Sequence, residues 1–475
     1  MSALLIFVAL YLLASIAIGL YAATRVRDTG DYVVAGRKLP FFMVFTMVFA
    51  TWFGAETVLG IPARFVEEGL GGILEDPFGA SMCLVLFGLF FVRKLYRMNL
   101  LTIGDYYRVR YNGKVEFIVS VCIVISYLGW VAAQITALGL VLNLLTQGAI
   151  TVQWGMLISA SIVLLYTVYG GMWSVAFTDM FQMTIIVVGL CYITWLVADM
   201  AGGAEHVITH AAQAGKFNFL PAFTSADVLA FVAAWVTMMF GSIPQQDVFQ
   251  RAMSAKSAKI GKWASVCGGS FYFLFAFVPI FLAYAAFLID PEMVERMLAI
   301  DPQRILPTLI MNDMPVFAQV MFFGALLSAL MSTASATLLA PSITLTENLI
   351  KPRFPMNDLQ QLRMTRIVVA GFTLAVTVFA LLSEGTSIYE MVGNAYKVTL
   401  VGAFVPLVVG LYWSRATTQG ALFSSIGGLL TWVLMETFGE GSIWPPQLLG
   451  LVVSFVGIFV GSLLPSFIGK RAAAA

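Results

Sequence analysis

The sequence predicts an all-α polytopic membrane protein, because its composition and its long apolar runs exclude an ordinary soluble domain. Of the 475 residues, 60% are hydrophobic and only 11% are charged, which is far from the balance of soluble globular chains. A helix needs about 20 apolar residues to cross the hydrocarbon core of a bilayer. By that measure the chain holds about thirteen candidate spans, so the lipid bilayer is its expected environment.

The candidate spans follow one another with short loops that leave no room for a separate soluble domain. They are 2–22, 41–62, 73–96, 116–146, 150–169, 174–199, 225–250, 262–289, 315–345, 366–383, 388–413, 418–437 and 446–467. A net charge of +1 argues against a nucleic-acid partner. The chain shows no Walker A, HExxH or GxSxG motif, so we expect no enzyme activity, and uphill transport would draw on an ion gradient.

The basic residues predict the orientation in the membrane. They concentrate in alternate loops, such as 93–114 and 351–366, and are scarce in the loops between them. By the positive-inside rule the basic side is cytoplasmic. An odd number of spans then places the N-terminus outside and the C-terminus in the cytoplasm of a multi-pass cell-membrane protein.

The span that begins at Phe41 carries polar and small residues at its centre, including Gly54, Glu56 and Thr57. A carboxylate at mid-membrane depth costs about 2.5–3.5 kcal/mol, so it usually faces a protein-lined cavity. Glycines beside it allow the helix to open and to leave carbonyl oxygens free for a ligand. The pattern therefore predicts a transporter whose binding site lies at an interrupted helix.

Hydroxyl-bearing residues crowd the middle of the span 315–345. Ser332 and Thr333 are adjacent, and the carbonyl of Ala329 lies one turn earlier on nearly the same face. Hard cations such as sodium prefer oxygen ligands, so one interpretation is a sodium site. The other is close helix packing through small residues, and spacing alone does not choose between them.

Asp179 is an isolated acid in the span 174–199, which follows the glycine pair Gly170 and Gly171. With no basic residue close in sequence, its carboxylate could attract a cation from solution. The alternative is an acid whose side chain reaches back to the cytoplasmic interface, about two turns away.

Three segments together resemble the sodium:solute symporter family, whose members include proline, sugar, pantothenate and choline transporters. They are ATWFGAETVLGIPARF from Ala50, LYTVYGGMWSVAFTDMFQM from Leu165 and SALMSTASATLL from Ser328. The resemblance extends across essentially the whole chain. It implies a sodium-coupled symporter with sodium as the coupling ion.

The resemblance also implies a single transmembrane domain, 1–475, built on two inverted five-helix repeats of the LeuT-like kind. The repeats would cover 41–199 and 225–413, preceded by an extra helix and cytoplasmic loop in 1–40 and followed by two helices in 414–475. Carried over from the family, the sodium ligands would be Ala50, Phe53, Ala329, Ser332 and Thr333, and the acid on the ion path would be Asp179.

Repeat symmetry then predicts a second broken helix at the matching place, where the chain reads FGSIPQQDVFQ from Phe240. Pro244 cannot donate a helical hydrogen bond, so the helix is kinked or open there. Gln245 and Gln246 would lie at the break as amide groups for a solute, and Asp247 could pair with Arg251 four residues later.

The nature of the solute is the most open point in the sequence. Trp52 and Trp130 lie deep in their spans, where ring faces near Glu56 could hold a cation, although the rings could also simply fill volume. Their surroundings resemble the choline-transporter branch, which has a tryptophan where this chain has Gln245. A choline-like cation is therefore one expectation, and an amino acid such as proline is the other.

Lys397 is a cation in the middle of the span 388–413. An unpaired buried ammonium is costly, so it should pair with a carboxylate of the protein or of the solute. A carboxylate-bearing solute would make it a binding residue. Two further functions stay open, namely a proton-coupled transporter of the same fold and a membrane sensor derived from a transporter.

Overall fold

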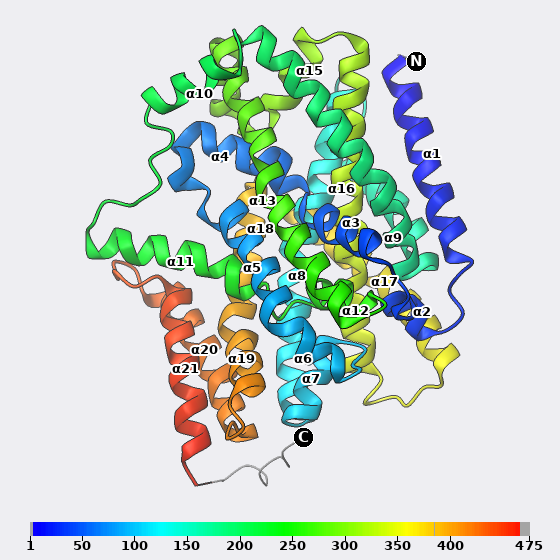
Figure 1. Ribbon diagram of the computed structural model, residues 1–475, viewed down its shortest axis with the longest axis vertical. Helices are drawn as coiled ribbons and strands as arrows, with labels where there is room; N and C mark the ends of the chain where they lie inside the picture. The colour runs from blue at the N-terminus through cyan, green and yellow to red at the C-terminus, as the bar shows by residue number, and fades with distance from the viewer. Residues whose placement is uncertain (1–2, 384, 466–475) are drawn as a thin grey trace.

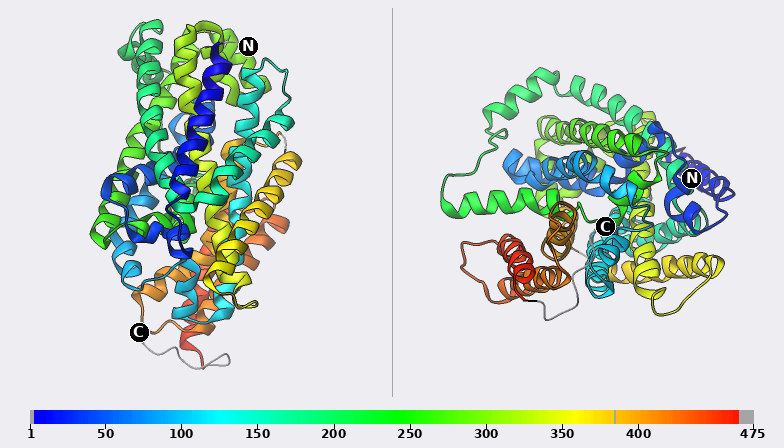
Figure 2. Two further views of the ribbon diagram at one scale, coloured as in Figure 1. Left: turned by 90° about the vertical axis from the view of Figure 1, so that its right-hand side faces the viewer. Right: turned by 60° about the horizontal axis from the view of Figure 1, so that its bottom comes forward.

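The computed structural model describes residues 3–383 and 385–465, and these residues form helices joined by short loops (Figure 1). Ten of the described helices are long and apolar enough to cross a membrane, and two bent helix pairs bring the total to twelve. The start of α1 (Ala3–Ala23) and the end of α21 (Pro446–Leu463) lie at opposite ends of the molecule (Figures 1 and 2). An all-helical membrane protein is therefore confirmed.

The remaining helices follow one another through the bundle. They are α2 (Thr29–Val34), η1 (Ala35–Arg37), α3 (Phe41–Trp52), η2 (Glu56–Gly60), α4 (Ile61–Glu68), η3 (Gly69–Gly72), η4 (Leu74–Gly79), α5 (Ala80–Leu86), η5 (Phe87–Phe91), α6 (Val92–Arg97), α7 (Ile103–Arg110), α8 (Gly113–Leu145), α9 (Val152–Met200), α10 (Ala204–Gln213), α11 (Ser225–Gly241), α12 (Gln246–Ser254), α13 (Ala258–Ile289), α14 (Pro291–Ile300), η6 (Pro302–Arg304), α15 (Ile305–Asp313), α16 (Val316–Thr344), η7 (Leu345–Ile350), α17 (Asp358–Leu382), α18 (Ile388–Thr399), η8 (Leu400–Phe404), α19 (Val405–Tyr412) and α20 (Thr418–Phe438).

The twelve spans correspond to the predicted thirteen once α9 is divided. Its 49 residues consist of two helices joined at a kink, and they include the predicted spans 150–169 and 174–199. At Gly171 its backbone leaves helical geometry, with φ of 50° and ψ of −139°. An added Cβ there would lie 2.5 Å from the carbonyl oxygen of Tyr32, so only glycine fits this break.

Two spans are broken, as predicted. The axis bends by 53° between α3 and the segment Glu56–Gly72, and by 45° between α11 and α12. In the first, the Gly54 N–H bonds the Trp52 carbonyl and no longer continues the helical pattern. In the second, Pro244 interrupts the pattern because it has no N–H. Both breaks leave backbone groups inside the protein, where other helices can satisfy them.

Candidate functional site

The break after α3 places a buried carboxylate against α8. The Trp130 indole Nε1 donates to Glu56 Oε1 at 3.1 Å, and Gln134 Nε2 donates to Glu56 Oε2 at 2.8 Å. The Gln134 amide oxygen in turn accepts the N–H of Ala55, at 2.9 Å, which the break leaves without a helical partner. Because a carboxylate has about four lone-pair positions, two bonds leave it able to meet a cation.

Four aromatic rings pack together beside this carboxylate, and one of them, Trp130, donates to it. Trp52 and Trp130 lie 5.4 Å apart between ring centroids, and Tyr396 of α18 lies 6.1 Å from Trp52 and 5.6 Å from Trp130. Tyr127, one turn before Trp130, stacks on it at 6.0 Å. All four rings are almost fully buried. We call Trp52, Trp130, Tyr396 and Tyr127 the aromatic cluster.

Polar atoms without a partner lie on and beside the aromatic cluster. Trp52 Nε1, the Tyr396 hydroxyl and Gln245 Oε1 are buried and form no hydrogen bond with the described residues. A buried donor or acceptor without a partner costs about 1–3 kcal/mol. These atoms are therefore suited to receive a solute or water.

The two glutamines at the second break point to different places. Gln245 Nε2 donates to Ser126 Oγ on α8 at 2.8 Å and to Thr399 Oγ1 on α18 at 3.3 Å, beside the aromatic cluster. Gln246 instead accepts the N–H of Ile103 at 2.8 Å and so holds the start of α7. The structure therefore brings Gln245 to the cluster and does not bring Gln246 there.

Two of the residues expected to bind sodium meet between α3 and α16. Thr333 Oγ1 donates to the Ala50 carbonyl at 3.4 Å. Phe53 ends α3 with ψ of 74°, which turns its carbonyl away from the helix axis. Ser332 Oγ, from the neighbouring position of α16, donates to Asp179 Oδ1 on α9 at 2.6 Å. Ala329, one turn earlier on α16, is fully buried.

Gly54 lies between the residues expected to bind sodium and those around Glu56. A Cβ added at Gly54 would lie 2.6 Å from Thr333 Oγ1, 2.8 Å from Gln134 Oε1 and 3.0 Å from Glu56 Oε2. These distances are shorter than real Cβ contacts, so a side chain does not fit without displacing its neighbours. The Thr333 hydroxyl of the expected sodium site and the Glu56 carboxylate thus lie on the same side of Gly54, close to each other.

A buried ion pair supports the second break. Arg251 Nη1 lies 3.9 Å from Asp247 Oδ2, and both side chains are almost fully buried. Asp247 Oδ1 accepts from the Tyr127 hydroxyl at 2.5 Å, and Arg251 Nε donates to Thr51 Oγ1 on α3 at 2.7 Å. The pairing predicted from the four-residue spacing is present, and it connects α12 to both α8 and α3.

Lys397 lies apart from the aromatic cluster. Its ammonium lies 3.3 Å from Glu436 Oε1 on α20, and the exposed fractions of the two side chains are 20% and 41%. The expectation that it pairs with a carboxylate is met within the protein. The structure does not bring Lys397 to the site that its neighbour Tyr396 helps to form.

A cavity of about 490 Å³ opens toward the end of the molecule that holds α14 and η6. Its lining includes Gly60, Arg64, Gln303 and Tyr389. Gly60 packs closely on Tyr389, with an added Cβ 3.3 Å from the Tyr389 nitrogen. The cavity therefore extends to the part of the first broken span that follows the break.

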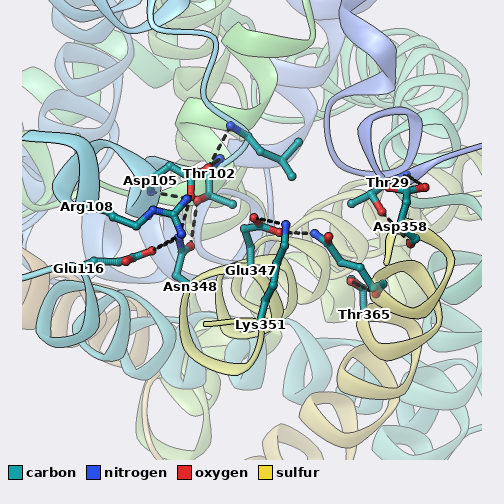
Figure 3. Close-up of polar contacts among 12 residues, drawn as sticks. Thr29, Thr102, Asp105, Arg108, Glu116, Glu347, Asn348, Lys351, Asp358 and Thr365 are labelled. Carbon is teal, nitrogen blue, oxygen red and sulfur yellow. Dashed lines mark hydrogen bonds and ion pairs between the residues drawn. The ribbon is translucent and has the colours of Figure 1, made fainter. Parts of the chain in front are cut away.

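Polar side chains join several helices at the opposite end of the bundle. Asn348 donates to Asp105 at 3.2 Å and to Glu116 at 2.8 Å, and Arg108 pairs with Asp105 at 2.9 Å (Figure 3). Nearby, Lys351 pairs with Glu347 at 2.7 Å. These contacts tie the ends of α7, α8 and η7 together on the side that the sequence predicts to be cytoplasmic.

The sequence analysis missed three residues of the site. Gln134 lies one turn after Trp130 and shares its face of α8, which is a signal that could have found it. Tyr127 lies one turn before Trp130 on the same face. Tyr396 had no comparable signal, because only packing decides that it faces the cluster while Lys397 faces α20.

Comparison with known proteins decides the family. The model of the sodium:solute symporter family matches residues 32–428. The chain belongs to the sodium:solute symporter family. It is thus a sodium-coupled, multi-pass membrane transporter of a small solute, and not an enzyme.

Relatives in the family differ in their solutes. The human high affinity choline transporter 1 is 27% identical over 92% of this chain and 77% of its own length. The sodium/pantothenate symporter of Escherichia coli K12 is 27% identical over 96% of both chains. In fold, the chain is similar to a sodium-coupled sialic acid symporter in its substrate-bound outward-open state, with a TM-score of 0.84, 18% identity and 97% coverage of both chains.

Proposed function

We propose that this symporter carries a small organic cation of the choline type into the cell together with sodium. Sodium would bind to the carbonyls of Ala50, Phe53 and Ala329 and to the hydroxyls of Ser332 and Thr333, and would leave past Asp179. The cation would lie against the rings of the aromatic cluster, with Glu56 as its counter-charge and Gln245 at its edge.

The observation that carries this proposal is the close approach at Gly54. Thr333 Oγ1 and Glu56 Oε2 both lie within 3.0 Å of the position of an added Cβ at this glycine. A sodium ion held by the Thr333 hydroxyl would therefore stabilise the broken backbone that also presents Glu56. Binding of either ligand would favour the arrangement that binds the other, which is the physical basis of coupling.

Charge and ring chemistry favour a cation over a carboxylate-bearing solute. A cation over a desolvated ring face gains up to about 2 kcal/mol, and Glu56 supplies a negative charge beside the rings. Lys397, the cation that could meet a solute carboxylate, pairs instead with Glu436. Similarity to choline transporters agrees with this choice, whereas the pantothenate relative keeps an anionic solute as the second candidate.

The arrangement in the membrane is part of the proposal. We infer two inverted repeats, 41–199 and 225–413, because the two bent pairs occupy corresponding positions in them. The end with α7 and η7 would face the cytoplasm and the cavity beside Tyr389 would face outward. Alternating access would then open the polar contacts of Asn348 and close the cavity.

The test is uptake into proteoliposomes under an inward sodium gradient, with labelled choline, proline, pantothenate and a sugar as separate solutes. Choline accumulation that collapses when potassium replaces sodium supports the proposal. Accumulation driven by a proton gradient alone would contradict sodium coupling. Accumulation of proline or pantothenate, with choline neither transported nor competing, would contradict the cation.

A further inference from the structure

A basic pocket lies at one end of the bundle, remote from the aromatic cluster. It has a volume of about 530 Å³ and lies between α6 and the start of α13. Its lining is Arg93, Arg97, Ser257, Ala258, Lys259, Lys262 and Trp263, with no acidic side chain. The volume is typical of pockets that hold a small ligand.

The four basic residues of this pocket are arranged as pairs on two helix faces. Arg93 and Arg97 are four residues apart on α6, and Lys259 and Lys262 are three apart on α13, so each pair shares a face. Arg93, Arg97 and Lys259 form no ion pair or hydrogen bond with the described residues. Arg93, Arg97 and Lys259 are exposed and have no counter-charge among the described residues, so an anion bound beside them would be stabilised.

The start of α13 adds backbone donors to the same pocket. Ser257 caps this 32-residue helix, and its hydroxyl accepts the N–H of Ile260 at 3.3 Å. The N–H groups of the first helical residues have no partner within the helix, and the residues Ser257, Ala258 and Lys259 at this helix start line the pocket. Phosphate groups bind well at such a helix start, where the helix dipole also favours negative charge.

The surroundings place the pocket at a membrane surface. Trp263 is 45% exposed, and Lys262 Nζ lies 5.2 Å from its ring centre. Tryptophan is common at the level of the lipid headgroups. One turn from Arg93 toward the bilayer, the side chains of Leu89 and Phe90 are 39% and 53% exposed. A headgroup in the pocket would therefore have an apolar surface beside it for its acyl chains.

We propose that this pocket binds the phosphodiester headgroup of an anionic phospholipid. Arg93, Arg97, Lys259 and Lys262 supply the positive charge, the start of α13 supplies N–H donors, and Leu89 and Phe90 contact the acyl chains. Basic pockets between membrane helices on the cytoplasmic side are suited to such lipids, and each basic residue near the surface contributes about 1 kcal/mol. The proposal does not depend on which solute the protein carries.

The lipid would sit against moving parts of the transporter. α6 and α12 both pack on α13, and α12 is the second half of a broken span. An added Cβ at Gly261 of α13 would lie 2.5 Å from the Ala252 carbonyl of α12, so the contact is close. A bound headgroup would bridge α6 and α13 beside that contact.

The experiment compares the full chain with two variants in nanodiscs of phosphatidylcholine containing a titrated fraction of phosphatidylglycerol. In the pocket variant, Arg93, Arg97, Lys259 and Lys262 are all replaced by Gln. In the control variant, four exposed basic residues on the same predicted face are replaced by Gln, namely Arg27, Lys114, Arg363 and Arg415. Bound phosphatidylglycerol is measured by native mass spectrometry after release from the nanodisc.

We expect the pocket variant to bind phosphatidylglycerol at least about tenfold more weakly, and the control variant to stay within about threefold of the unaltered chain. Equal losses in both variants would overturn the proposal, because a general surface charge would then explain binding. Displacement of the lipid by millimolar glycerol 3-phosphate or inorganic phosphate would also overturn it, in favour of a free phosphate site. If the pocket variant fails to fold, the double variant Arg93→Gln/Arg97→Gln is measured in its place. We expect its affinity for phosphatidylglycerol to fall at least about fivefold, and an unchanged affinity would overturn the proposal.

Discussion

Ser332 Oγ donates a hydrogen bond of 2.6 Å to Asp179 Oδ1, so the proposed sodium site and the proposed ion path are in direct contact. The second oxygen, Asp179 Oδ2, is buried and has no partner among the described residues. An ion that leaves Ser332 would therefore meet a carboxylate oxygen within one step. Because the two side chains are in contact, we expect the effects of mutations at them to be coupled.

Removing both hydroxyls of the sodium site should raise the sodium requirement. The double variant Ser332→Ala/Thr333→Ala removes two oxygen ligands, each worth about 1 kcal/mol, so the sodium concentration for half-maximal uptake should rise at least about tenfold. Sodium-activation curves in proteoliposomes measure this. The control is Ser342→Ala on the same helix, whose hydroxyl bonds only its own helix at Leu338 and should leave the curve unchanged. An unaltered curve in the double variant would exclude this site.

Asp179→Asn should slow sodium release more than it weakens solute recognition. Asparagine can still accept the Ser332 hydrogen bond, but a neutral acceptor is about 1 kcal/mol weaker than a charged one. We expect turnover to fall about fivefold at high internal sodium, with the solute KM changed less than about twofold. Uptake measured across a series of internal sodium concentrations tests this. Kinetics equal to those of the unaltered chain would leave Asp179 with no role in the ion path.

Glu56→Gln should damage both stability and cation binding, because Glu56 accepts from two donors. Trp130 and Gln134 each donate to it, and an amide offers only one acceptor oxygen, so one donor loses its partner at a cost of about 1–3 kcal/mol. Thermal unfolding in detergent and choline uptake measure the two effects.

A swapped variant separates these two effects of Glu56. In Glu56→Gln/Gln134→Glu the donors regain acceptors, while the carboxylate moves to α8. We expect stability to recover by more than half, with choline affinity still reduced. Full recovery of both would mean that the position of the charge does not matter.

Trp52→Ala should weaken binding of a cationic solute by about 1–2 kcal/mol, or about five- to thirtyfold, through loss of one ring face. Competition of unlabelled choline against labelled uptake measures the affinity. Trp195→Ala on α9 is the matched control, because that ring is 68% exposed and lies away from the site. Unchanged affinity for every transported solute in Trp52→Ala would refute the cation site.

Gly54→Ala should weaken sodium and solute binding together. The added methyl carbon would meet Thr333 Oγ1 and Gln134 Oε1 at 2.6 and 2.8 Å, and overpacking of this kind costs about 1–3 kcal/mol. Gly371→Ala on α17 is the control, since nothing lies within 4 Å of its added Cβ. A change in the sodium requirement with no change in the solute KM would show that the two sites do not share this point.

The two breaks could be predicted from the sequence because their causes are local. Glu56 beside Gly54, and Pro244 within an apolar run, disrupt a helix whatever surrounds it. The boundary between the predicted spans 150–169 and 174–199 could be predicted in the same way, because Gly171 lies there and its backbone leaves helical geometry.

The environment of each side chain depends on partners far away in the sequence. Gln245 and Gln246 are adjacent, yet one contacts Ser126 and the other Ile103. Similarly, no local pattern indicates that Lys397 pairs with Glu436, 39 residues later on a helix outside the two proposed repeats. The sequence therefore suggested Trp52, Trp130, Glu56 and Gln245, which the structure brings together, but could not show that Gln246 and Lys397 lie elsewhere.

Through the neighbouring residues Tyr396 and Lys397, α18 contacts both the aromatic cluster and the C-terminal helices. Tyr396 stacks on Trp52, and Lys397 holds Glu436 of α20, which packs along α21. A rotation of α18 that withdraws the ring from the aromatic cluster must also strain the ion pair on its other side. Helices that touch neither the solute nor sodium are thus in a position to set how readily the site opens.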